Sequence, residues 1–353
     1  WVADRLHVAL HVSGAAAVQL SQPMSNETAP TDSVADVTDA IDTAWILLCT
    51  CLVFWEQAGF AMWEAGSLPA RSLHSILLKN MCDAAIAAAA FLVCGYAFSF
   101  GEGGSFIGHS RFFLIDMGES DYPSWFFQWA FAATAATTVS GCMAERTKFV
   151  AYLIYSWFIT ALIYPIVVRW LWADDGWLCA WGKNGVFGLG MIDFAGSGVV
   201  HMLGGVAGLV GSAIVGPRKG YFTGDRDKST FRGHSLALTA LGVYVRSESH
   251  SRTSEMWGIW FRVPSHHASP NECALPPHRW QCLWFGWFGF NAGYTFGVTK
   301  GRWKTAALIC INTTLSPAAS VIGCLALEKY LKGFWDASAA MNAVVAGLVG
   351  ITG

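Results

Sequence analysis

The stretch DFAGSGVVHMLGGVAGLVG, from Asp193 to Gly211, is almost wholly apolar, yet it opens with an acid and carries His201. Its small residues and His201 recur at intervals of four, three, four and three residues, which places them on one face of a helix. Gly204 and Gly208 form a small-xxx-small pair, which lets a second helix approach closely. We therefore expect His201 to face protein or a cavity rather than lipid. The residues of this face are Ser197, His201, Gly204, Gly208 and Gly211.

The two ionisable groups of this stretch have a structural and a functional interpretation. Asp193 stands at the predicted start of the helix, where a carboxylate can cap free amide groups and meet the positive end of the dipole. The structural interpretation of His201 is a packed, hydrogen-bonded histidine. In a bilayer, however, ionisable side chains are rare and usually mark a substrate or proton path. The functional interpretation of His201 is therefore preferred.

The composition is that of a membrane protein. Of the 353 residues, 54% are hydrophobic and 13% are charged, whereas roughly a quarter of an average soluble domain is charged. Apolar runs long enough to cross a lipid bilayer recur along the chain. The net charge of −2 argues against a general nucleic-acid-binding surface. These features predict an all-α, polytopic helical membrane protein.

Hydropathy predicts seven membrane spans and part of an eighth. The sixth is interrupted, because HSLALTALGV (234–243) is too short to cross and LWFGWFGFNAGYTFGV (283–298) is a separate apolar piece. The other predicted spans are 43–63, 82–100, 125–144, 149–172, 194–215, 303–326 and an eighth from about 337.

The charges between the spans predict an orientation. Basic residues follow spans one, three and five, whereas acidic residues follow spans two and four. By the positive-inside rule, the N-terminus is predicted to lie outside. Lys300, Arg302 and Lys304 follow span six and disagree with this order. The basic residues after spans one, three and five are Arg71, Lys79, Arg146, Lys148, Arg218, Lys219, Arg226, Lys228 and Arg232.

Residues 1–42 are interpreted as an N-terminal extension of a transmembrane domain that covers 43–353. The chain begins with Trp1, and a polar, acidic segment follows Met24. We expect Met24 to be the natural start and residues 1–23 to be upstream sequence. The rest of the extension would be extracellular.

A polar segment, 244–282, separates the two halves of the sixth span. It holds four of the chain's 10 histidines, together with Cys273 and Cys282, which raises the question of a metal site. The spacing fits none of the usual zinc patterns, so no metal is predicted. The segment is either a real loop or a foreign insertion, such as translated intron. We prefer the insertion, because its removal would join the two apolar pieces into one span of ordinary length.

Several long motifs resemble those of the ammonium transporter family, which also includes methylammonium permeases and the more distant Rh proteins. The segment DFAGSGVVHMLGGVAGLVGSAIVGPRKGYF (193–222) is similar to the family's hallmark. EQAGFAMWEAG (56–66) resembles its first helix, SWFFQWAFAATAATTVSGCMAERTKF (124–149) its third, LWFGWFGFNAG (283–293) its sixth and AGLVGITG (346–353) its eighth. The matching segments cover most of 43–243 and 283–353, in the family's order.

The resemblance implies an integral protein of the plasma membrane that forms a homotrimer with one pore in each protomer. The family fold has about eleven helices arranged as an inverted repeat. Its members move ammonium, and many also move methylammonium. No cofactor and no enzymatic activity are implied.

The resemblance also assigns roles to individual residues. The outer vestibule that recruits the cation would hold Trp172, Phe127 and Phe131. The stacked pair that gates the pore would be Phe131 and Phe290. Asp193 would support the recruitment site without touching the ligand, and His201 would be the first of two facing pore histidines.

Elementary physical chemistry supports these roles independently. A cation over an aromatic face gains about 0.5–2 kcal/mol or more when it is desolvated. A bare ion in hydrocarbon would cost tens of kcal/mol in the idealised Born picture. We therefore expect the cation to be recruited, to lose a proton and to continue as ammonia past a neutral imidazole, which can accept a hydrogen bond or relay the proton. Potassium has no proton to lose, so such a pore would reject it.

The sequence departs from the family pattern at several places. Tyr294 stands where the family usually has a serine that helps to bind the cation, and its bulkier ring either adds a cation–π surface or narrows the vestibule. Arg169 places a positive charge near the mouth, which would repel a cation unless Asp174 or Asp175 pairs with it. The family's second pore histidine lies in the tenth helix, whereas this sequence ends within the eighth. We accordingly expect a fragment that lacks a working pore by itself and whose full-length gene product transports ammonium.

Three other functional classes share some of these sequence features. An ammonium sensor would keep the recruitment residues but signal instead of conduct. An Rh-type gas channel is less favoured, because that branch generally lacks the vestibule tryptophan. An intramembrane enzyme would need paired aspartates, a Ser–His pair or a zinc motif, and the spans carry none of them.

Overall fold

The computed structural model describes residues 33–182, 189–223, 228–243 and 282–353. The chain divides into Trp1–Ala40 and Ile41–Gly353, and the contacts below all lie within the second unit. In the described residues the regular structure is helical, apart from two isolated bridges. The all-α prediction is confirmed. The predicted segment 244–282 lies outside the described residues except for Cys282, and so does most of the N-terminal extension 1–42.

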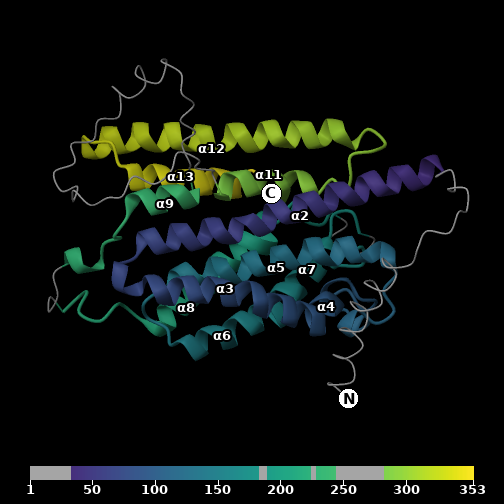
Figure 1. Ribbon diagram of the computed structural model, residues 1–353, viewed down its shortest axis with the longest axis horizontal. Coiled ribbons are helices and arrows are strands. Elements are labelled where there is room, and N and C mark those ends of the chain that lie inside the picture. The colour runs from purple at the N-terminus through teal and green to yellow at the C-terminus, as the bar shows by residue number, and fades with distance from the viewer. Residues whose placement is uncertain (1–32, 183–188, 224–227, 244–281) are drawn as a thin grey trace, which may run out of the picture. The chain divides into compact units, whose positions relative to one another are not determined.

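The described helices (Figure 1) coincide with the predicted spans, but α2 begins at Val34 and α3 at Leu73, each nine residues before the predicted start. Widened helical turns join α3 to α4 at Phe91–Gly95 and α6 to α7 at Ile159–Ile163, and a third, Ser197–Met202, leads into α8. The helices are α2 (Val34–Ser67), α3 (Leu73–Ala90), α4 (Tyr96–Phe100), α5 (Tyr122–Met143), α6 (Phe149–Phe158), α7 (Tyr164–Trp172), α8 (Leu203–Val215), α9 (Leu236–Val243), α11 (Cys282–Gly293), α12 (Arg302–Lys332) and α13 (Ala337–Gly350).

Five of the described helical segments are long and apolar enough to cross a membrane. Many of their large apolar side chains are exposed, among them Leu209 and Ile214 of α8 and Leu315 and Ile322 of α12. Exposed apolar faces of this kind are expected where the surrounding solvent is lipid. The chain is therefore an integral membrane protein. The five segments are Val34–Ser67, Ala70–Phe100, Phe149–Trp172, Ser197–Val215 and Arg302–Lys332.

Helix α5 is buried along most of its length and contacts α3 and α8. It is rich in alanine and threonine, and its hydroxyl groups are satisfied within the protein. Thr134 and Thr138, for example, donate to backbone carbonyls one turn earlier. Because α5 is surrounded by other helices, its side chains must be small enough for close packing, and they need not be as apolar as side chains that face lipid. This explains why α5 is not among the five segments whose length and composition suit a membrane span.

The glycines of the opening stretch pack against α5, as their spacing predicts. A Cβ at Gly204 would lie 2.8 Å from the Thr138 Cβ, and one at Gly208 would lie 2.6 Å from the Cys142 Sγ. Neither distance leaves room for a side chain, so both glycines are required by the close approach of the two helices.

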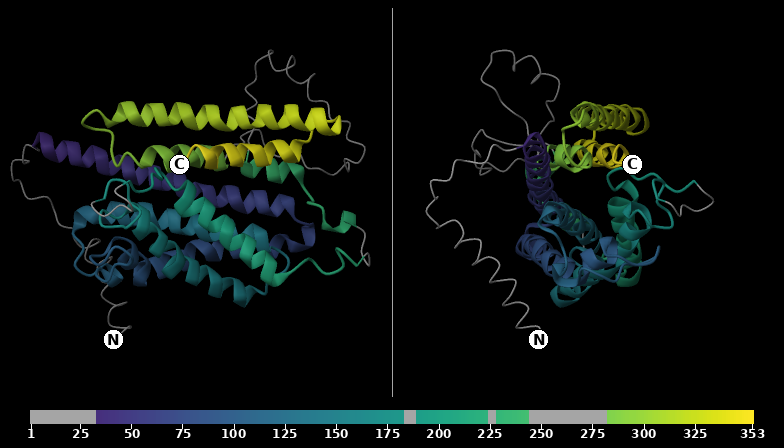
Figure 2. Two further views of the ribbon diagram at one scale, coloured as in Figure 1. Left: turned by 180° about the vertical axis from the view of Figure 1, so that it is seen from behind. Right: turned by 90° about the vertical axis from the view of Figure 1, so that its right-hand side faces the viewer.

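Helices α9 and α11 continue one another along α2. Passing along α2 from Gly66 toward Cys49, the packing partners are first α9 residues and then α11 residues. When residues 244–281 are left out of the count, these partners are spaced three or four residues apart, so successive turns of α9 and α11 contact successive turns of α2. The partners are Thr239, Gly242, Leu283, Gly286, Gly289 and Gly293. Helix α12 packs along α11 and α13 (Figures 1 and 2).

Two charged residues differ from their predicted environment. Lys79 was predicted to lie in a basic loop, but α3 begins at Leu73, so Lys79 is helical and only 3% exposed, with its Nζ 4.9 Å from the centre of the Tyr152 ring. Arg302 belongs to the loop that disagreed with the charge order. It pairs with Asp42, which offsets one of the three positive charges there.

Candidate functional site

The structure brings the five aromatic residues predicted for the vestibule and gate into one continuous cluster. Phe127 and Phe131 lie one turn apart on α5, with ring centroids 4.7 Å apart. Phe290 of α11 packs on Phe131 at 4.1 Å. Tyr294 follows α11, and its ring lies 4.8 Å from Trp172 and 5.2 Å from Phe131. Residues from three separate spans therefore meet at one point.

Asp193 organises the segment that leads to His201. Its carboxylate accepts hydrogen bonds from the amides of Gly196, Gly198 and Val199, at 2.8–2.9 Å. These are the free amides at the start of a helix, so the acid satisfies them and also meets the favourable end of the dipole. The carbonyl of Asp193 accepts a hydrogen bond from the Trp172 indole at 2.8 Å. One residue thus anchors both the helix start and the tryptophan.

His201 lies at the opposite end of the aromatic cluster from Trp172. Its ring stacks on Trp287 with centroids 4.9 Å apart and an interplanar angle of 17°, and it lies 5.3 Å from Phe290. It is 7% exposed, and its Nε2 has no hydrogen-bond partner in the structure. An unpaired polar atom in such a buried ring is costly unless a ligand or water uses it. The widened turn at Ser197–Met202 that carries His201 is a feature often found at functional sites.

A cavity of about 400 Å³ opens beside Trp172 and Tyr294, and we call it the tryptophan cavity. Gln128 lines it, and its side-chain amide donates to the Tyr294 hydroxyl at 3.1 Å. Tyr294 thus presents both a ring and an oriented hydroxyl to the cavity. The lining residues are Phe100, Gln128, Trp172, Trp181, Phe194, Tyr294 and Phe296.

A second cavity, of about 500 Å³, lies at the His201 end of the cluster, and we call it the histidine cavity. Its walls come from α2, α5, α11 and α13 as well as from the turn that carries His201. They include His201, Trp287, Glu64, Thr138 and Asn342. The contacts run from one cavity to the other in the order Trp172, Phe131, Phe290 and His201.

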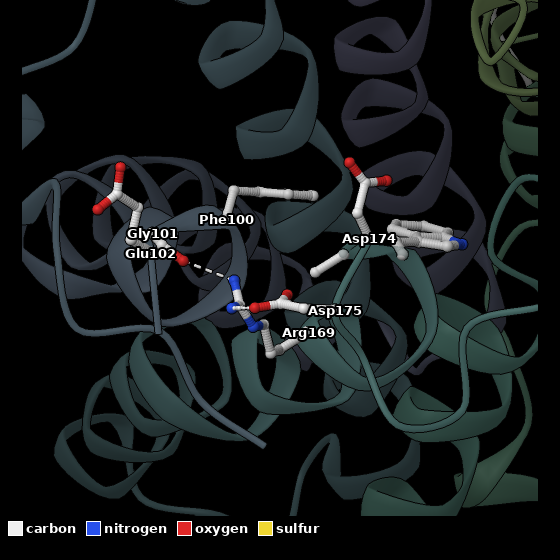
Figure 3. Close-up of a pocket in the computed structure, with 8 residues that line it drawn as sticks. Phe100, Gly101, Glu102, Arg169, Asp174 and Asp175 are labelled. Carbon is white, nitrogen blue, oxygen red and sulfur yellow. Dashed lines mark hydrogen bonds and ion pairs between the residues drawn. The ribbon is translucent and has the colours of Figure 1, made fainter. Parts of the chain in front are cut away.

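Arg169 lies beside the tryptophan cavity but is neutralised. It lines a pocket of about 290 Å³ together with Trp172. Its guanidinium pairs with Asp175 and donates to backbone carbonyls, including those of Gly101 and Gly104. Figure 3 shows the carboxylates of Glu102 and Asp174 pointing away from it. The pairing with Asp175 therefore neutralises the charge that was expected to repel a cation.

Three residues of this region were missed by sequence reasoning. Gln128 follows Phe127 directly, and nothing in its spacing marks it as the partner of Tyr294. Trp287 precedes Phe290 by one helical turn, and this spacing was a usable signal. Glu64 was visible in EQAGFAMWEAG as an acid inside an apolar span, which by itself suggests a functional site.

Comparisons with known proteins show which family the chain resembles. A sequence model of the Ammonium Transporter Family matches residues 44–245 and 281–353. The chain is 38% identical to ammonium transporter 1 member 3 of Solanum lycopersicum over 90% of its own residues and 63% of that protein. It is 35% identical to ammonium transporter 3 of Dictyostelium discoideum over 93% of its residues and 66% of that protein. The chain thus spans about two thirds of the length of these relatives.

Among solved structures, the chain is similar to one titled Sensor Amt Protein. The TM-score is 0.73 at 30% sequence identity, and the match covers 90% of this chain and 69% of the other. The break in the family match between 245 and 281 coincides with the interval between α9 and α11.

Proposed function

Because this chain belongs to the ammonium transporter family, we propose that its full-length protein conducts ammonium across a membrane through the aromatic cluster of this chain. The observation that carries this proposal is the unbroken path of ring contacts between two cavities, from Trp172 to His201. Its relatives are named as transporters, and none of the residues on this path forms a nucleophile system.

In the proposed mechanism, the tryptophan cavity recruits the cation. The faces of Trp172, Tyr294 and Phe296 offer cation–π attraction, and the Tyr294 hydroxyl, oriented by Gln128, offers a lone pair to an ammonium N–H. Potassium also gains from the rings, but it cannot donate a hydrogen bond. Asp193 supports the site electrostatically, although its carboxylate is already occupied by backbone amides.

Passage then requires the Phe131 and Phe290 rings to move apart, since their centroids are 4.1 Å apart. A hydrated ion would lose its water at this constriction, which makes neutral ammonia much cheaper to pass than ammonium. The departing proton leaves the ammonium nitrogen with its electron pair. The free Nε2 of His201 can accept this proton and release it into the histidine cavity, so that one positive charge crosses with each ammonia; the same nitrogen can instead accept a hydrogen bond from ammonia.

The assembly and location also belong to this proposal. The family resemblance supports a homotrimer in the plasma membrane, with methylammonium as a second substrate. The charge order of the loops supports an extracellular N-terminus. In this orientation the tryptophan cavity faces outward and the histidine cavity faces the cytoplasm.

The proposal is tested with Trp172→Leu, and Trp170→Leu is its matched control. Trp170 lies on the same helix, but it packs on Phe106 and Trp177 away from the tryptophan cavity. Loss of a cation–π contact of about 0.5–2 kcal/mol should raise the half-saturating ammonium concentration about 2- to 30-fold. The measurement is ammonium-dependent charge flux in lipid vesicles. Equal behaviour of the two variants would contradict the assignment of Trp172.

An ammonium sensor is the second candidate, because a similar solved structure is titled as a sensor. A sensor would bind ammonium at the same rings without carrying it. Uptake of methylammonium by cells that lack their own transporters would separate the two functions. Binding without uptake would favour the sensor.

A further inference from the structure

The histidine cavity contains a carboxyl group that the proposed conduction path does not use. Glu64 of α2 lines this cavity and is 7% exposed. Its Oε2 accepts hydrogen bonds from Asn80 at 2.8 Å and from Ser140 at 3.1 Å. These bonds fix the carboxyl group in place and leave Oε1 as the oxygen available for another partner.

Access to Oε1 depends on a glycine. Gly141 of α5 also lines the histidine cavity, and a Cβ at this position would lie 3.1 Å from the Glu64 Oε1. The missing side chain therefore leaves this oxygen uncovered. Asn342, which is exposed, lines the same cavity and connects it to the surface.

The charges buried near Glu64 do not balance. Lys79 and Asp83 are the charged neighbours that act on it. Asp83 is fully buried and accepts hydrogen bonds from Tyr152, Ser156 and Thr137. Two acids and one lysine leave one formal negative charge without a counter-charge. A carboxyl group at this depth either holds a proton or pairs with a cation.

The remaining walls suit a small cation that donates hydrogen bonds. Trp63 and Trp287 provide aromatic faces, and the Ser67 and Thr138 hydroxyls provide oxygen acceptors. The unpaired Nε2 of His201, in a ring that is more than nine-tenths buried, belongs to the same wall. The cavity thus combines a carboxylate, aromatic rings and neutral acceptors.

We propose that the histidine cavity is a second ammonium-binding site, in which the Glu64 carboxylate pairs with the cation. This proposal rests on the proposed function, because it takes ammonium as the ligand. The second site would hold ammonium at the end of the path opposite to the tryptophan cavity. It differs from the first site in having a carboxyl group in its lining. This predicts that the two sites respond to different substitutions.

The test measures binding of isotope-labelled ammonium to the purified chain by NMR, which does not depend on transport. Glu64→Gln keeps the size of the side chain and an acceptor for Asn80, but removes the charge. It should weaken one of two binding sites at least about tenfold, as expected when one member of a buried charge pair is lost. Trp172→Leu should weaken the other site only. Gly141→Ala, which covers Oε1 and retains the acid, should reproduce the effect of Glu64→Gln.

The matched control is Glu56→Gln. Glu56 is a second buried acid of α2, but it does not line the histidine cavity, so both sites should survive its substitution. Unchanged binding in Glu64→Gln, or an equal loss of both sites, would overturn the proposal. Competition by potassium equal to that by ammonium would also overturn it, because it would mean a general cation site. Two binding sites without vesicle flux would instead contradict only the proposed conduction.

Discussion

The guanidinium of Arg169 shows how a positive charge is accommodated next to a site for cations. It is 2% exposed, and the Asp175 carboxylate and several backbone carbonyls surround it. Those carbonyls belong to the segment after α4, so Arg169 holds this segment against α7. Its role is structural, because its positive charge is neutralised by groups of the protein and does not act on a cation in the cavity.

Replacement of Arg169 by methionine should therefore lower stability more than it changes selectivity. Buried carbonyls would lose their donor, and we expect a loss of about 2–4 kcal/mol in the free energy of unfolding. Asp175→Asn should cost about 0–1 kcal/mol, because the Asp175 side chain is 42% exposed. Thermal unfolding of the two variants in detergent would measure the difference. Similar losses for both would mean that the ion pair, rather than the carbonyl contacts, stabilises the segment.

Tyr294 replaces a serine that is usual in the family, and the surrounding residues accommodate its larger ring. Its ring contacts Phe127, Phe131 and Trp172, and its hydroxyl is held by Gln128. The tyrosine therefore joins the aromatic cluster and retains a hydroxyl at the cavity. Of the two effects expected from the larger ring, an added aromatic surface agrees with these contacts.

Among the helices, the pairing of α5 with α8 depends on single glycines. Gly204 and Gly205 are neighbours in the sequence, but only Gly204 faces α5. A Cβ there would lie 2.8 Å from Thr138, whereas nothing lies within 4 Å of a Cβ at Gly205. The two positions therefore separate the effect of packing from that of helix propensity.

Gly204→Leu should destabilise the bundle by about 1–3 kcal/mol, because the new side chain forces the two helices apart. Gly205→Leu should be neutral or slightly stabilising, since leucine favours helices more than glycine does. Both variants can be compared by thermal unfolding in the same detergent. Equal destabilisation would contradict the close α5–α8 contact. His201 lies on the same stretch, so Gly204→Leu should also reduce transport.

In the molecule as a whole, α9 and α11 supply a continuous series of helical turns that pack along α2. The 8 residues of α9 and the 12 of α11 would together form a helix about 30 Å long, at about 1.5 Å per residue. This length is that of a complete span. The contacts with α2 keep helical spacing when 244–281 are left out, which supports the interpretation of this segment as an insertion.

Deletion of residues 244–281 should therefore leave a folded protein with ammonium binding unchanged. The direct join of Val243 to Cys282 would preserve the packing of Thr239, Gly242 and Leu283 on α2. Ammonium binding and thermal unfolding of the deletion variant would check this. A control deletion that also removes Val243 and Cys282 turns the following residues by about 200° around the helix axis and should abolish both. Loss of folding in the first variant would show that the segment is needed.

The amino-acid sequence by itself determined the helices, the membrane class and the family. Its spans agree with α2 to α13 because apolar length and small-residue spacing are local properties. The motifs also identified Trp172, Phe131, Phe290 and His201 as candidates. The start of α3 was placed too late, at 82 instead of Leu73, since Lys79 and Asn80 look like loop residues until their buried partners are known.

Only the tertiary structure decided how those candidates are arranged and what surrounds them. It brought α5, α7 and α11 together at the Phe131 ring, paired Arg169 with Asp175, and placed Glu64 in the same cavity as His201. The physical reason is that hydropathy reports whether a residue lies in a span. The residue that pairs with a buried charge or packs on a buried ring often lies far away in the sequence. The local sequence pattern does not specify it.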